Sequence, residues 1–361
     1  MEENHAPPLP APEPTSAPPA RFRHQLTSAT LGLLFFVLLI HLLQLFATVL
    51  QQLFTAGLIA YLILPLHHWL VRRGVPFLGS CVLIIVGTLC CFATVGFLVT
   101  SSLEDMIPKL PQYSQSLIRL LHQTSEMVPG LDPEMLQRIL SSETATVVRS
   151  VNLLRAALET LFGFFSQALL VVVYLVFLLA EQTTFAQRIE KAFAADSAGH
   201  VEEVVAKINA SIVQYLAVKT LMSLLGAVIT TATLLVFGVD YPFFWGVLAF
   251  VLNYIPYLGS LVAVVLPALL CMVQLESLRY SLLVLLLLGL MQNGIGYLVE
   301  PRLAGRRLDL SPLVIILSLA FWGSLWGIAG MILAVPLVVV MKIVLENIPA
   351  TRPIAILMSN V

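Results

Sequence analysis

An uncharged run of 32 residues, from Leu310 to Met341, limits most strongly what this chain can fold into. A helix needs only about 20 apolar residues to cross the hydrocarbon core of a membrane. Other uncharged runs longer than 18 residues occur along the chain, of which 59% is hydrophobic and 11% charged, against roughly a quarter charged in soluble domains. The sequence therefore predicts an all-α, polytopic membrane protein with about eight membrane segments.

The apolar runs divide the chain into expected regions. Residues 1–24 are rich in proline and alanine and are expected to form a disordered cytoplasmic tail. A membrane domain at 25–347 precedes a C-terminal tail at 348–361. Spans are expected at about 26–46, 49–70, 76–101, 160–180, 215–237 and 281–299, with two longer runs at 241–275 and 310–341. Amphipathic spacing of apolar residues marks 102–158 and 182–214 as helical segments outside these spans.

The basic residues predict an orientation, because short cytoplasmic loops carry an excess of Lys and Arg. Arginines at 21, 23, 72 and 73 place the N-terminus in the cytoplasm, 102–158 outside it and 182–214 inside. Arginines 302, 306 and 307 become cytoplasmic only if the run at 241–275 enters and leaves the membrane on one side. The run at 310–341 would be about 50 Å long as one helix, so it is also interpreted as a re-entrant or broken hairpin.

The two long runs form a weak internal repeat when Pro242 is placed over Pro312. Each run is interrupted by a polar, aromatic and glycine-rich patch, NYIPYLGS at 253–260 and WGSLWGIAG at 322–330. A broken helix leaves backbone groups that must be buried in protein or face water, and paired breaks indicate a substrate site. The candidate path residues are Asn253, Tyr254, Pro256, Tyr257, Gly259, Trp322, Gly323, Ser324, Trp326, Gly327 and Gly330. Alternatively, the glycines only allow close helix packing.

Three stretches resemble the autoinducer-2 exporter family of bacterial permeases: EPRLAGRRLDLSPLVIILSLAFWGSLWGIAGMILAVPLVVVMKI, NYIPYLGS with the following LPALL, and AYLILPLHHWLVRRG at 60–74. The resemblance covers about 25–347. It implies a multi-pass transporter of the bacterial cytoplasmic membrane, which forms a homo-oligomer. The structural and gating candidates either match the family pattern or end the seventh span, where arginines would make the cytoplasmic entrance positively charged. They are Pro65, Pro267, Glu300, Pro301, Arg302, Gly305, Arg306, Pro312 and Pro336.

The sequence departs from the family pattern in two places. Val218 and Lys219 follow Tyr215 where many members have glycine and glutamine, and Lys219 is interpreted as reaching the membrane interface or a salt-bridge partner. Many members also carry an acidic residue in the helix where this chain has Gln292 and Asn293. An intramembrane carboxylate is the usual proton carrier, so its replacement weighs against ion coupling.

The sequence thus favours a secondary or facilitated transporter of a small solute, such as an autoinducer-2-like signalling molecule. A Na⁺(Li⁺)/H⁺ antiporter and a non-transporting membrane scaffold are the alternatives. The chain has no phosphate-binding glycine loop and no His-Glu-x-x-His motif, so no catalytic residue, cofactor or metal is expected. Lys and Arg are scattered at span ends, and the net charge is -1, which excludes a basic nucleic-acid surface. The expected partners are the lipid bilayer and a small-molecule or ion substrate.

Overall fold

The computed structural model describes residues 20–125, 170–178, 180–181, 184, 188, 191–192, 195–299, 302–303 and 309–360. Every regular element in these ranges is helical, which confirms the predicted fold class. The chain divides into two compact units, Met1–Thr48 and Val49–Val361. In the first unit, α1 (Ala20–Leu45) leaves large apolar side chains such as Leu34 and Phe35 exposed, as lipid contact requires.

Five described helices are long and apolar enough to cross a membrane: α1, α2 (Ala47–Arg72), α3 (Phe77–Met106), α7 (Ala195–Val236) and α12 (Pro312–Glu346). Three shorter apolar helices follow α7, namely α8 (Pro242–Leu252), α9 (Leu258–Gln274) and α10 (Leu278–Gly294). The remaining elements are η1 (Ile107–Lys109), α4 (Leu110–Ser125), the π-helix η2 (Ile295–Val299) and α13 (Arg352–Leu357). The predicted span at 160–180 falls mostly outside the described residues.

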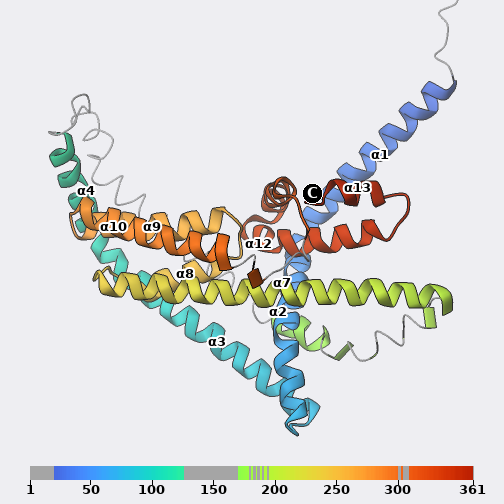
Figure 1. Ribbon diagram of the computed structural model, residues 1–361, viewed down its shortest axis with the longest axis horizontal. Helices are drawn as coiled ribbons and strands as arrows, with labels where there is room; N and C mark the ends of the chain where they lie inside the picture. Colours follow the sequence, from blue (N-terminus) through green and yellow to red (C-terminus); the bar gives the residue numbers. More distant parts are fainter. Residues whose placement is uncertain are drawn as a thin grey trace, which may run out of the picture. The chain divides into compact units, whose positions relative to one another are not determined.

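The longest element, α7, has 42 residues and is therefore about 63 Å long at 1.5 Å per residue. The described part of the amphipathic segment expected at 182–214, from Ala195 on, is continuous with the span expected at 215–237, because no proline or left-handed residue interrupts this stretch. The amphipathic segment and the apolar span thus form a single rod, along which α8, α10 and α12 pack (Figure 1).

Helices α8 and α9 form the first hairpin, and the predicted break at 253–260 is confirmed. Pro256 lacks an N–H group and disfavours helical backbone at the preceding residue, while Tyr257 has φ 63°. The two arms then pack against each other, since Trp245 of α8 shares a buried core with Ala268 and Cys271 of α9. At the tip, a Cβ atom added to Gly259 would lie only 1.7 Å from the carbonyl oxygen of Leu252.

The second hairpin lies within α12, whose helical backbone is interrupted at Gly327 (φ 63°, ψ -141°). The Ser318 hydroxyl donates a hydrogen bond of 3.1 Å to the carbonyl oxygen of Ala334. In a continuous helix these residues would be about 24 Å apart, so the chain reverses between them. The predicted break at 322–330 is therefore confirmed, and this hairpin has a first arm beginning at Pro312 and a second arm ending at Glu346.

The two hairpins correspond feature by feature, at an offset of 70 or 71 residues, which supports the repeat seen in the sequence. Both first arms begin with proline at the N-terminal helical position. Both tips contain a residue with φ 63°, and both place a glycine of the second arm against a carbonyl oxygen of the first. The equivalent pairs are Pro242 and Pro312, Leu252 and Trp322, Tyr257 and Gly327, and Gly259 and Gly330.

The bases of the hairpins lie at opposite ends of α7. Near its C-terminal end, Leu234 packs with Trp245 and other residues of the first hairpin. Towards its N-terminal end, Ile212 packs with Leu310 and Ile343 of the second hairpin. The first tip lies against Thr220 and Gly226, between these two positions on α7. This opposed arrangement is the geometry that a pair of re-entrant hairpins entering from opposite membrane faces would need, and membrane entry itself stays a prediction.

Candidate functional site

The tip of the first hairpin carries a pair of amide side chains against α7. Gln292 of α10 donates a weak hydrogen bond from Nε2 to Oδ1 of Asn253, at 3.4 Å. A Cβ atom added to Gly226 of α7 would lie 2.4 Å from Asn253 Nδ2 and 3.3 Å from Gln292 Oε1. Glycine at position 226 thus lets both amides approach the α7 backbone. The single bond between them leaves donor capacity on Asn253 and acceptor capacity on Gln292.

Tyr254 connects the same tip to the rest of the path region. Its hydroxyl forms a hydrogen bond of 2.6 Å with the Thr220 hydroxyl of α7. Its ring packs edge-on against Phe250 and also contacts a cluster formed by α7 and the second arm of α12, which includes Leu216 and Val339. The first tip therefore contacts α7 and packs against a cluster to which the second hairpin also contributes.

The tip of the second hairpin is aromatic, and it is held by α2. The ring centroids of Trp322 and Trp326 are 4.7 Å apart, so the two indoles lie side by side, and both residues are buried. The carbonyl oxygen of Trp326 accepts a hydrogen bond of 3.4 Å from Gln51 Nε2, and Phe54 lies beside the Trp326 ring. Ser324 and Gly327 are exposed at the end of the hairpin.

A buried polar stripe on α7 was missed by the sequence reasoning. Lys219, Ser223, Gly226 and Thr230 recur every three or four residues and so share one helix face. The three residues are at most 8% exposed, so Lys219 is buried in the protein and does not extend to the membrane interface. The alternative expectation, that Lys219 reaches a salt-bridge partner, stays a prediction. The stripe could have been predicted from the recurrence of polar residues at helical spacing within an apolar segment, since buried polar residues in membrane segments mark functional sites.

The structural and gating candidates lie in several separate parts of the protein. Pro312 begins the second hairpin, whereas Pro267 and Pro336 are buried within second arms. Pro65 is exposed inside α2, and Arg302 is exposed. The candidates Glu300, Pro301, Gly305 and Arg306 lie outside the described residues. Those candidates that the structure describes therefore do not gather with the tips as one site.

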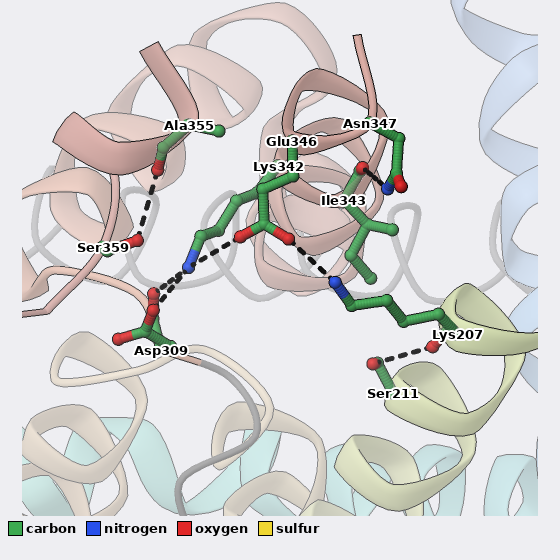
Figure 2. Close-up of polar contacts among 9 residues, drawn as sticks. All are labelled: Lys207, Ser211, Asp309, Lys342, Ile343, Glu346, Asn347, Ala355 and Ser359. Atoms are coloured by element: carbon green, nitrogen blue, oxygen red, sulfur yellow. Dashed lines mark hydrogen bonds and ion pairs between the residues drawn. The ribbon is translucent and has the colours of Figure 1, made fainter. Parts of the chain in front are cut away.

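The base of the second hairpin is closed by a buried lysine (Figure 2). Lys342 Nζ donates to both the backbone carbonyl and the carboxylate of Asp309, the latter at 2.9 Å, and its side chain is 5% exposed. Glu346 Oε1 lies 3.6 Å from the same Nζ. The hydrogen bond from Lys342, with smaller contributions from Ser359 and the Asn360 N–H, holds the pKa of Asp309 below its ordinary value.

This lowered pKa predicts an acid-sensitive closure. The pKa of Asp309 is lower in the folded state than in the unfolded state, so the ionised carboxylate stabilises the folded protein at pH values above the unfolded-state pKa. This stabilisation is lost as the pH falls through the folded-state pKa. We therefore expect the Tm of the purified protein to decrease when the pH is lowered below about 4. The Asp309→Asn variant should have a lower Tm at neutral pH, and its Tm should decrease less when the pH is lowered over the same range. Equal acid-induced losses for both proteins, measured by thermal unfolding in detergent, would contradict this assignment.

Comparison with known proteins places this geometry in a transporter family. The model of the AI-2E family transporter matches residues 32–350, a range that includes both hairpins. YhhT of Escherichia coli (strain K12) is 33% identical over 318 residues, which cover 86% of this chain and 88% of YhhT. The AI-2 transport protein TqsA of the same strain is 31% identical over 307 residues, covering 84% of this chain and 87% of TqsA. YrrI of Bacillus subtilis (strain 168) is 27% identical over 306 residues, covering 80% and 83%. The chain therefore belongs to the AI-2E transporter family, and it is a multi-pass membrane transporter of a small solute.

Proposed function

We propose that the solute crosses between the tips of the two opposed hairpins by facilitated or secondary transport. The observation that carries this proposal is the equivalence of the two hairpin breaks, while the hairpin bases lie towards opposite ends of α7. Interrupted membrane segments related in this way place a binding site near the bilayer midplane. Asn253, Gln292 and Tyr254 supply polar groups at the first tip, and Trp322 and Trp326 supply flat apolar surface at the second.

The proposed substrate is a small polar molecule of the autoinducer-2 type. Amides and hydroxyls supply both donors and acceptors without charge, which suits a hydroxylated solute. TqsA, a relative of this chain, is an AI-2 transport protein. The runs from Tyr241 to Leu275 and from Leu310 to Met341, which include both tips, contain no Asp or Glu, so they lack the carboxylate that proton or sodium coupling commonly uses. This favours solute transport over the Na⁺(Li⁺)/H⁺ antiport alternative.

We also propose the orientation that the basic residues predict, with the N-terminus in the cytoplasm of a bacterium and the protein in its inner membrane. The base of the second hairpin then faces the cytoplasm, and the base of the first faces the opposite side. Single cysteines replacing Glu276 and Arg352 test this, because they follow the first and second hairpins respectively. An impermeant thiol reagent added to intact cells should label only the former.

The path is tested by flux through reconstituted vesicles. A panel that includes autoinducer-2 and other small polyols is measured with and without an imposed pH or Na⁺ gradient. For a solute that the parent protein carries, we expect Asn253→Leu to lower the initial flux about 10-fold or more, since an unpaired buried polar group costs about 1–3 kcal/mol. Gln292→Leu should act similarly, because it removes the partner of Asn253.

Asn293→Leu is the matched control, since Asn293 adjoins Gln292, is exposed and bonds only to the carbonyl of Gly289 within its own helix. Its flux should equal that of the parent. If both Asn253→Leu and Gln292→Leu insert normally and transport at the parental rate, the proposed path is wrong.

A further inference from the structure

Two salt-bridge clusters hold the hairpin bases to neighbouring helices, and the first begins at Asp240. This residue comes directly before the first arm of the first hairpin. Its carboxylate oxygen Oδ2 accepts hydrogen bonds from Lys109 Nζ at 2.8 Å and from the Tyr113 hydroxyl at 2.7 Å. Lys109 ends η1 and Tyr113 lies in α4. The start of the hairpin is thus bound by a segment that is remote from it in the sequence.

The end of the same hairpin is bound by the same helix. Glu276 follows the second arm, and its Oε1 accepts hydrogen bonds from the Ser116 hydroxyl at 2.8 Å and from Arg119 Nη2 at 3.0 Å. Ser116 and Arg119 continue the face of α4 that carries Tyr113, at helical spacing. We call these contacts of Asp240 and Glu276 the first salt-bridge cluster.

The second hairpin repeats this arrangement at the other end of α7 (Figure 2). Asp309 and Glu346 flank its arms, 69 and 70 residues after Asp240 and Glu276. Here the basic partner from another helix is Lys207 of α7, whose Nζ lies 3.0 Å from Glu346 Oε2. We call this contact of Glu346 with Lys207 the second salt-bridge cluster; the bonds of Lys342 to Asp309 and Glu346 lie within the hairpin.

Each hairpin is also closed by bonds within itself, which do not depend on its neighbours. In the first, the Gln274 amide accepts from the Asp240 N–H at 2.7 Å and donates to the carbonyl of Gly238 at 2.9 Å. In the second, buried Lys342 binds Asp309. A hairpin closed in this way can shift as one body while its own arms stay together.

The bonds to neighbouring helices differ in exposure from these internal ones. The side chains of Lys109, Arg119 and Lys207 are 43%, 59% and 55% exposed. Exposed ion pairs contribute little to stability individually, so they can break without unfolding either hairpin. Each hairpin therefore combines a permanent internal closure with a weaker attachment to the surrounding helices.

We infer that the two salt-bridge clusters are the two gates of the transport path. Release of Asp240 and Glu276 from η1 and α4 frees the first hairpin to move at the Val236 end of α7. Release of Glu346 from Lys207 frees the second hairpin at the opposite end. Because the two clusters lie at opposite ends of the rod, each release exposes the tips from a different side of the membrane. The basic residues Lys109, Arg119 and Lys207 are positioning residues, which need not touch the solute.

The test measures exposure of the first tip from each side and needs no substrate. Cys81, Cys90, Cys91 and Cys271 are replaced by alanine, and Ser260→Cys beside Gly259 serves as reporter. An impermeant maleimide is added to right-side-out or inside-out membrane vesicles that contain the full chain. We expect Arg119→Ala to raise the labelling rate about threefold from one side, and Lys207→Ala to raise it about threefold from the other, as loss of one exposed ion pair allows.

Charge exchange and conservative variants separate gating from damage to the fold. The double variant Arg119→Glu/Glu276→Arg and the single variant Arg119→Lys should both restore the parental labelling rates. Arg279→Ala, at an exposed arginine near the same base, should label as the parent does. The inference is overturned if Arg119→Ala and Lys207→Ala raise labelling from the same side, if neither changes it, or if Arg279→Ala changes it equally. Normal gating with no solute flux would contradict the proposed function alone.

Discussion

Gly259→Ala is expected to separate the two arms of the first hairpin, and Gly330→Ala those of the second. The added methyl groups would lie 1.7 Å from the carbonyl oxygen of Leu252 and 2.0 Å from that of Trp322. Both obstacles are backbone atoms, which cannot rotate away, so the arms themselves must move. Overpacking of this kind costs about 1–3 kcal/mol or more, whereas alanine would otherwise stabilise a helix relative to glycine by up to about 1 kcal/mol.

We therefore expect both variants to unfold at lower temperature and to lose nearly all transport. Gly289→Ala is the control, because nothing lies within 4 Å of an added Cβ in that helical position. Thermal unfolding and vesicle flux measure the two effects. If Gly259→Ala and Gly330→Ala were as stable as Gly289→Ala, the close approach of the arms would be wrong.

Gly327→Ala is expected to reduce transport strongly while the protein still inserts into the membrane. The backbone at Gly327 has φ 63° and ψ -141°, a region that is almost restricted to glycine. Forcing a side chain to adopt such a conformation costs about 1–3 kcal/mol. The chain can avoid this cost by straightening the tip, which would remove the reversal between Ser318 and Ala334.

The defect at Gly327 should come from backbone conformation rather than from crowding, since an added Cβ there meets nothing within 4 Å. Gly327→Ala and Gly327→Val should therefore lose flux to a similar extent, because this backbone region excludes any residue with a Cβ atom whatever its size. Gly87→Ala, at an open position of α3, should leave flux unchanged. Parental flux for Gly327→Ala with a strong loss for Gly327→Val would contradict the conformational explanation.

The two breaks could be predicted because the sequence marks them by local chemistry. Pro256 and the cluster of glycines around Gly327 are unusual inside apolar runs, and each has a direct effect on the backbone. Their equivalence could also be predicted, since Pro242 and Pro312 set the register. Local signals of this kind do not depend on which helices the hairpins contact.

Contacts between distant elements could not be predicted in the same way. Gln292 bonds to Asn253 only because Gly226 of α7 leaves room for both amides, and nothing near position 292 in the sequence indicates its partner. The continuity of α7 from Ala195 was missed for a different reason. Its charged first part and apolar second part differ in composition, although the backbone has no cause to stop between them.

The absence of charge in the two long apolar runs also limits how the protein responds to a membrane potential. Moving one elementary charge through 100 mV involves about 2.3 kcal/mol. The runs from Tyr241 to Leu275 and from Leu310 to Met341 contain no Asp, Glu, Lys or Arg. The electric field therefore does no work on ionised side chains within these runs when the hairpins shift. Any voltage dependence of transport would then report the charge of the solute, of a co-transported ion or of charged residues outside the runs, such as Lys342 and Glu346.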